Sequence, residues 1–188
     1  FRSQLGIDRF YTLNSSQYPI TVADTDYQGN FVSDRKTYDL ILDQVRSTDN
    51  KFVSAITMQN HVQWNSSEPA TITATGQGFT AEENENLNSY VRLLSFTDQA
   101  TRDFLDQLKT LDKKVTVVFY GDHLPGLYPE SAFVTDPSAQ YKTDYFVWSN
   151  FETEDYHYDL VNSSDMNALM LETTNNKVSP YYALLTEV

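Results

Sequence analysis

The feature that most constrains the fold is a hydrophobic run that ends abruptly in polar residues, at positions 114–126 (KVTVVFYGDHLPG). Residues 115–120 are rich in β-branched and aromatic side chains, which predicts a strand buried on both faces of a sheet. This strand ends at Gly121, and Asp122 and His123 follow directly. Ligands of open α/β sheets bind at the carboxyl ends of strands, and a carboxylate beside an imidazole suits a divalent metal. We infer that this stretch is part of a metal-dependent phosphate-ester site.

A second strand is predicted to end in the same way. Residues 52–58 (FVSAITM) are apolar and are followed by Gln59, Asn60 and His61. Apolar residues at helical spacing over positions 87–111 predict a long helix between the two strands. The order strand, helix, strand predicts parallel strands with a right-handed crossover, and hence an α/β fold. His61 is therefore expected near Asp122, although both residues could instead serve only as hydrogen-bonding groups.

Other elements are expected on both sides of this unit. A helix should begin near Ser33 with Asp34 as its N-cap, and residues 144–148 should form a third strand. A helix is predicted over residues 165–172, and a final helix should begin at Pro180.

Several other polar and aromatic side chains are candidates for functional roles. Asp98 falls on the predicted apolar stripe of the long helix, so its carboxylate is expected to be hydrogen-bonded or paired, with support of His61 or His123 as the alternative. Arg92 is expected to be solvated. Trp64 and Tyr128 could line a cleft, with packing as the alternative. His157, in an acidic loop, is expected to be a surface residue.

Composition excludes several classes of function. The formal charge is −13, with only 13 Lys and Arg, which argues against nucleic-acid binding. The chain has no Cys, so disulfides, zinc-thiolate sites and a cysteine nucleophile are excluded. No signal peptide or membrane span is recognisable in the 188 residues. The length predicts one domain over residues 1–188, and because the chain begins with Phe1, it is expected to be part of a longer protein.

The motif at residues 120–125 (YGDHLP) resembles the lipoteichoic acid synthase-like branch of the sulfatase and alkaline phosphatase superfamily. Residues 57–61 (TMQNH) resemble the family's strand that ends in an Asn-His or Ser-His pair. Residues 5–10 (LGIDRF) and 145–150 (YFVWSN) resemble two further family segments. The resemblance implies a partial alkaline-phosphatase/sulfatase-like sheet with mainly parallel strands flanked by helices.

The resemblance also implies an activity. The family moves phosphoglycerol from phosphatidylglycerol to a cell-envelope polymer or glycolipid on the extracellular face of a bacterial membrane, using Mn²⁺ or Mg²⁺ and a threonine nucleophile. Matched to its motifs, Asp122 and His123 would be metal ligands. His61 would lie at the substrate phosphate, for acid–base catalysis or electrostatic stabilisation.

The family's nucleophilic Thr, a metal-binding Glu and its Trp and Arg contacts have no counterpart here, so the chain resembles the carboxyl-terminal half of the catalytic domain. It is expected to be inactive alone, to bind metal weakly or not at all, and to need the amino-terminal half. An exposed strand edge could also pair two copies. Three alternatives stay open: a phosphoethanolamine transferase, a sulfatase and a non-catalytic surface or scaffold domain.

Overall fold

The computed structural model describes residues 4, 6–47, 49–66, 68, 71–156 and 158–186 of the chain. The chain divides into two compact units. The first comprises Phe1–Thr75 with Asn84–Thr101, and the second comprises Gly76–Glu83 with Arg102–Val188. Of the helices in the described residues, none is both long and apolar enough to cross a lipid bilayer.

The first unit contains a small β-hairpin. A 3₁₀ turn, η1 (Asp24–Asp26), leads into β1 (Tyr27–Gln28), which pairs antiparallel with β2 (Phe31–Val32). Gly29 forms the turn with a φ of +63°, and a Cβ at this position would clash with the carbonyl oxygen of Asn65. Both the positive φ and the close approach require glycine here.

The helix predicted after residue 33 is α1 (Asp34–Val45). Its N-cap is Ser33, whose hydroxyl oxygen accepts a hydrogen bond from the Lys36 N–H at 3.2 Å. The prediction that Asp34 caps this helix was therefore wrong by one residue. Asp34 is instead the first helical residue, and it is fully buried.

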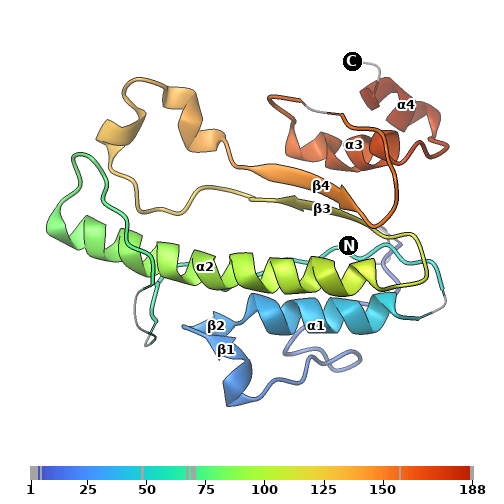
Figure 1. The fold of residues 1–188 in the computed structure, drawn as a ribbon, viewed down its shortest axis with the longest axis horizontal. Coiled ribbons are helices and arrows are strands. Elements are labelled where there is room, and N and C mark those ends of the chain that lie inside the picture. The colour runs from blue at the N-terminus through green and yellow to red at the C-terminus, as the bar shows by residue number, and fades with distance from the viewer. Residues whose placement is uncertain are drawn as a thin grey trace. The chain divides into compact units, whose positions relative to one another are not determined.

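The long helix predicted from apolar spacing is α2 (Ala81–Lys109), which Figure 1 shows as one continuous element. It begins earlier than the apolar pattern indicated, at a capping box. The Thr80 hydroxyl oxygen accepts from the Glu83 N–H at 3.2 Å, and the Thr80 N–H donates to Glu83 Oε2 at 2.6 Å. These reciprocal bonds satisfy two backbone donors, so polar residues specify the start of the helix.

The buried face of α2 includes Leu87, Phe104 and Leu108 as predicted, but its middle part is rotated by about one residue from the predicted stripe. Its buried residues are Leu87, Arg92, Leu93, Thr97, Ala100, Phe104 and Leu108. Asp98 was predicted on the apolar stripe but is exposed, as is Leu94. Arg92 was predicted to be solvated but is buried. Because Leu93 and Leu94 are adjacent, either could begin a helical stripe, and contacts with the rest of the unit decide between them.

Residues 52–58 do not form the predicted buried strand. They have no regular structure, and Phe52 and Ile56 are 71% and 82% exposed. No strand in the described part of the chain pairs with this segment. A strand is stabilised by backbone hydrogen bonds to a neighbour, so an apolar sequence alone does not produce one.

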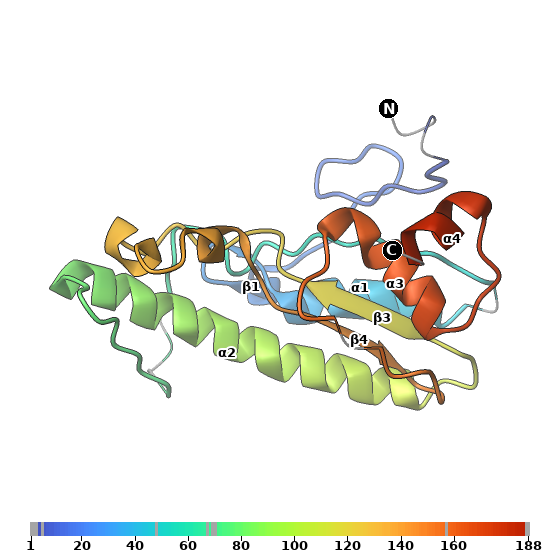
Figure 2. The same ribbon diagram turned by 90° about the horizontal axis from the view of Figure 1, so that it is seen from above.

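The second unit is built on two of the predicted strands, β3 (Thr116–Tyr120) and β4 (Tyr145–Ser149), which lie side by side in Figures 1 and 2. They pair antiparallel, with the rings of Phe119 and Phe146 stacked across the ladder at 5.1 Å. The expectation of mainly parallel strands is therefore wrong for this pair. Strand β3 was also expected to be buried on both faces, but its residues are half-buried and Tyr120 is exposed. Residues 121–144, all described, contain no α-helix that could carry the chain across the sheet, so β4 returns in the opposite direction.

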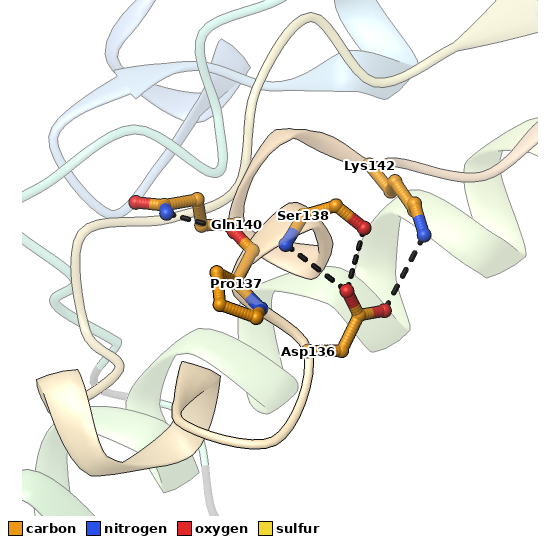
Figure 3. Close-up of polar contacts among 5 residues, drawn as sticks. All are labelled: Asp136, Pro137, Ser138, Gln140 and Lys142. Atoms are coloured by element: carbon orange, nitrogen blue, oxygen red, sulfur yellow. Dashed lines mark hydrogen bonds and ion pairs between the residues drawn. The ribbon is translucent and has the colours of Figure 1, made fainter.

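The connection between these strands contains two 3₁₀ helices, η2 (Glu130–Phe133) and η3 (Pro137–Tyr141). Figure 3 shows how Asp136 caps η3. Its Oδ1 accepts hydrogen bonds from the N–H and hydroxyl of Ser138, at 3.0 and 2.6 Å, and its Oδ2 lies 3.3 Å from Lys142 Nζ. The Ser138 bonds, with the Lys142 ammonium, hold the pKa of Asp136 below its ordinary value. The loop that follows β3 is thus locally ordered.

Two helices complete the second unit, as the sequence predicted: α3 (Met166–Thr173) and α4 (Pro180–Thr186). Helix α3 packs against α4 and β3. The buried apolar residues of this unit are Phe104, Leu108, Leu127, Met166, Ala168 and Leu169.

Asn150, immediately after β4, joins three backbone segments. Its Oδ1 accepts from the Val115 N–H at 2.8 Å, and its Nδ2 donates to the carbonyls of Leu108 and Lys113, at 3.1 and 2.8 Å. The side chain therefore ties the end of α2 to the start of β3.

Replacing Asn150 by aspartate should lower the free energy of unfolding by about 2 kcal/mol, because two donors are lost and a carboxylate faces two carbonyl oxygens. The measurement is the urea concentration at which half of the chain is unfolded. The slope of the unfolding free energy against urea concentration should stay constant. The same replacement at Asn86, exposed on α2, is the matched control and should stay within about 0.5 kcal/mol. An unchanged midpoint for Asn150→Asp would show that these bonds contribute nothing.

Candidate functional site

The candidate site begins where β3 ends, at Gly121. The Gly121 N–H donates to the Asp144 carbonyl at 3.2 Å, and the Thr143 hydroxyl donates to the Gly121 carbonyl at 2.6 Å. A Cβ on Gly121 would lie only 3.0 Å from Thr143 Cβ, so this close approach favours glycine. The segment leading into β4 therefore holds the start of the loop that carries the predicted metal ligands.

Asp122 and His123 are brought together at this strand end. The His123 N–H donates to Asp122 Oδ1 at 3.0 Å, and His123 Nε2 lies 3.8 Å from Asp122 Oδ2. Their side chains are 77% and 67% exposed. One carboxylate oxygen and one ring nitrogen are thus close to each other and accessible from solvent.

The hydrogen bond at the other ring nitrogen sets the tautomer of His123. Nδ1 lies 2.8 Å from the Leu124 carbonyl oxygen, which can only accept, so Nδ1 carries the proton of the neutral ring. In this tautomer, Nε2 carries the lone pair of the neutral ring. Metal-binding histidines commonly donate their second N–H to a carbonyl or carboxylate in this way.

The chemistry of the residues present fits a divalent metal, but they number only two. A carboxylate oxygen and a neutral imidazole nitrogen are suitable ligands for divalent cations. Among the described residues, no group of three or more His, Cys, Asp or Glu side chains is arranged to hold a metal ion. Asp122 and His123 therefore offer two possible donors, and a bound ion would need further donors from water, substrate or other protein groups.

His61 belongs to the first unit, and its ring is fixed like that of His123. Its Nδ1 lies 2.8 Å from the Val62 carbonyl oxygen, so Nε2 is free in the neutral ring. Its backbone N–H donates to the Met58 carbonyl at 3.0 Å, and the ring makes an edge contact with Phe31 at 5.6 Å. The imidazole is exposed, with its tautomer and its backbone both constrained.

Three other residues considered from the sequence are not assigned to the site. His157 lies outside the described residues. Trp64 is buried, its Nε1 donates to the Asn60 carbonyl at 2.9 Å, and its ring packs against Tyr90. Tyr128 packs edge-on against Phe79. The packing interpretation therefore fits Trp64 and Tyr128.

Two surface hollows of the first unit, about 540 and 440 Å³, are not lined by His61, Asp122 or His123. The shape of the surface therefore does not identify the candidate residues, which are selected by their hydrogen bonds and by the chemistry of their donor atoms.

Sequence reasoning missed a buried polar cluster beside His61. Gln59 is 2% exposed and Asp34 is fully buried, and both bond to side chains or backbone of the same unit. Burial raises the pKa of Asp34, against hydrogen bonds from Thr97, Thr57 and the Gln59 backbone that lower it. The only sequence signal was a polar residue directly after an apolar run, which does not reveal burial.

Comparisons with known proteins agree with one another. A model of the Sulfatase family matches residues 1–176. The Streptococcus pyogenes phosphoglycerol transferase GacH, solved in complex with sn-glycerol-1-phosphate, aligns with 99% of the chain at 50% identity and a TM-score of 0.92. The chain spans 48% of that protein.

Two curated proteins of Rhizobium meliloti (strain 1021) are also similar. The capsular polysaccharide biosynthesis protein RkpI is 30% identical over 122 residues, and a putative cyclic β-1,2-glucan modification protein is 26% identical over 139 residues. These alignments cover 63% and 65% of the chain. They span only 20% and 22% of the relatives' own lengths.

Proposed function

The chain belongs to the sulfatase family, and from this premise we propose that it is part of a metal-dependent phosphoglycerol transferase on the extracellular face of a bacterial membrane. The observation that carries the proposal is the 50% identity to a phosphoglycerol transferase over 99% of the chain. The superfamily resemblance and the α/β sulfatase-like fold class predicted from the sequence are confirmed by the same comparisons. Membrane anchorage would come from segments outside this chain.

The proposed donor is the phosphoglycerol head group of phosphatidylglycerol. The bound sn-glycerol-1-phosphate of GacH supports this choice, since it is the same chemical group without its lipid. The proposed acceptor is a cell-envelope polymer or glycolipid. Two relatives described by their roles with a capsular polysaccharide and a cyclic glucan support an acceptor that contains carbohydrate.

In this proposal, Asp122 Oδ2 and His123 Nε2 would hold Mn²⁺ or Mg²⁺. A bound divalent ion would stabilise negative charge on phosphoryl oxygens as a Lewis acid. Asp122 contributes a negative charge to the site, and the Leu124 carbonyl keeps the lone pair of His123 Nε2 available. Gly121, clamped by Thr143, holds the two ligands at the end of β3.

His61 is the proposed catalytic residue of this chain. With Nδ1 held on the Val62 carbonyl, Nε2 can accept a proton from a hydroxyl nucleophile or, once protonated, donate a hydrogen bond to a phosphate oxygen. The ring needs no change of tautomer for either role.

No residue of this chain matches the family's nucleophilic threonine, so we propose that the isolated chain is inactive. Its obligatory partner is then the amino-terminal half of the same catalytic domain, which would supply the nucleophile and further metal ligands. A divalent ion should bind only weakly to the two donors of the chain alone.

The test uses the protein at its natural length, with vesicles of phosphatidylglycerol or of phosphatidylethanolamine. Release of diacylglycerol from phosphatidylglycerol is expected when Mn²⁺ is added, and phosphatidylethanolamine should react at least about tenfold more slowly. A preference for phosphatidylethanolamine would instead assign a phosphoethanolamine transferase. Absence of both turnover and metal binding would assign a surface or scaffold domain.

A further inference from the structure

A buried cluster of hydrogen-bonded side chains includes the two residues that precede His61. Its members are Asp34, Gln59, Asn60 and Thr97, which we call the Thr97 hub. All four belong to the first unit, and three of them are at least 95% buried. None of them has a part in the chemistry proposed above.

The amide of Gln59 joins two helices. Its Oε1 accepts from the Asp34 N–H, at the first residue of α1, at 2.9 Å. Its Nε2 donates to the Leu93 carbonyl and to Thr97 Oγ1 of α2, both at 3.0 Å. The residue two positions before His61 is therefore anchored to α1 and α2 together.

The hydroxyl of Thr97 lies at the centre of the cluster. It donates to Asp34 Oδ2 at 2.6 Å and accepts from Gln59 Nε2 at 3.0 Å and Asn60 Nδ2 at 2.8 Å. A hydroxyl has one proton and two lone pairs, so these three bonds use its full capacity. Removing the oxygen would leave the carboxyl and two amide groups of its partners without this common bond.

The same segment is held on the other side of His61. The Asn60 carbonyl accepts from Trp64 Nε1 at 2.9 Å, and the His61 N–H donates to the Met58 carbonyl at 3.0 Å. The segment before it, residues 52–58, has no strand partner among the described residues. Side-chain hydrogen bonds of the Thr97 hub therefore hold this segment in place, as the backbone hydrogen bonds of a β-ladder would.

Burying Asp34 carries a desolvation cost, which an apolar residue would avoid. Asp34 Oδ1 and Asn60 Oδ1 are buried without a hydrogen-bond partner, but the bonds that meet at Thr97 Oγ1 still tie the side chains of Gln59 and Asn60 to one arrangement of the helices around them. A displacement of about 1 Å at a reacting group can lower a rate by about 100-fold. We propose that Thr97 is a positioning residue whose hydroxyl fixes the backbone of Gln59 and Asn60, and through them the placement of the His61 imidazole.

This inference rests on the proposed function for its kinetic part only. In the natural-length protein, Thr97→Val removes the hydroxyl at nearly constant volume and should lower kcat for phosphoglycerol transfer by about tenfold or more. KM should change by less than about threefold, because substrate contacts are untouched. Thr97→Ser, which restores the hydroxyl, should recover most of kcat.

Thr101 offers a matched control one turn further along α2. Its hydroxyl lies 3.1 Å from the Tyr38 hydroxyl, and neither Thr101 nor Tyr38 belongs to the Thr97 hub. Thr101→Val therefore loses a comparable hydrogen bond and should keep the kcat of the unmodified protein. An equal loss of kcat in both valine variants would show a general effect on stability and would overturn the proposal.

A second readout does not depend on turnover. In isotope-labelled natural-length protein, the His61 ring signals can be assigned as those that disappear in the His61→Gln variant. Thr97→Val should shift and broaden the His61 ring signals, while Thr97→Ser and Thr101→Val should leave them in place. If the unmodified protein transfers no phosphoglycerol, the proposed function fails, and unshifted His61 signals in Thr97→Val would separately overturn the positioning role.

Discussion

Asp122→Ala in the natural-length protein should lower Mn²⁺-dependent phosphoglycerol transfer by about 100-fold or more. Loss of a group that only hydrogen-bonds to a metal ligand typically lowers metal affinity or activity by about 10–100-fold. This change removes a proposed metal ligand itself. It also removes the negative charge beside His123 Nε2, 3.8 Å away, that would attract the cation. Turnover of labelled phosphatidylglycerol and Mn²⁺ binding by calorimetry should fall together.

Asp112 provides the control for the lost charge. It is exposed in the turn before β3, at the opposite end of the strand from Asp122. Asp112→Ala should retain full turnover and full metal affinity. Unchanged values for Asp122→Ala as well would remove Asp122 from the proposed metal site, and a loss in turnover without a loss in metal affinity would assign it a different role.

His61→Gln should lower kcat by about 10²–10⁴-fold, the range that general acid–base groups contribute. Glutamine can still donate one hydrogen bond but cannot exchange a proton at neutral pH. Metal affinity should be unchanged, which separates His61 from Asp122 and His123. The measurement is single-turnover transfer at saturating phosphatidylglycerol.

His157 is the second histidine outside the metal pair and supplies the control for this change. It was predicted from the sequence to be a surface residue, so His157→Gln should not alter kcat. Similar losses in both variants, or a kcat within about threefold of the unmodified protein for His61→Gln, would contradict the assignment of His61.

The sequence by itself predicted the elements whose signals are local. The β-branched run of β3 and the proline at the start of α4 each gave a correct element at nearly the correct position. The apolar repeat likewise predicted α2, although it missed the capping box that starts the helix. The motif at residues 120–125 also led to the correct superfamily, because it resembles a motif of that family.

The tertiary structure alone decided what depends on partners distant in the chain. The direction of β4 follows from a connection without a crossover helix, and residues 52–58 lack a strand partner in the described part of the chain. The buried face of α2 was ambiguous at Leu93 and Leu94 until packing selected one of them. The Thr97 hub joins residues up to 63 positions apart, so no local pattern could reveal it. Local sequence encodes backbone preference and ligand chemistry, whereas burial, strand direction and hydrogen-bond partners arise only when separate segments meet in space.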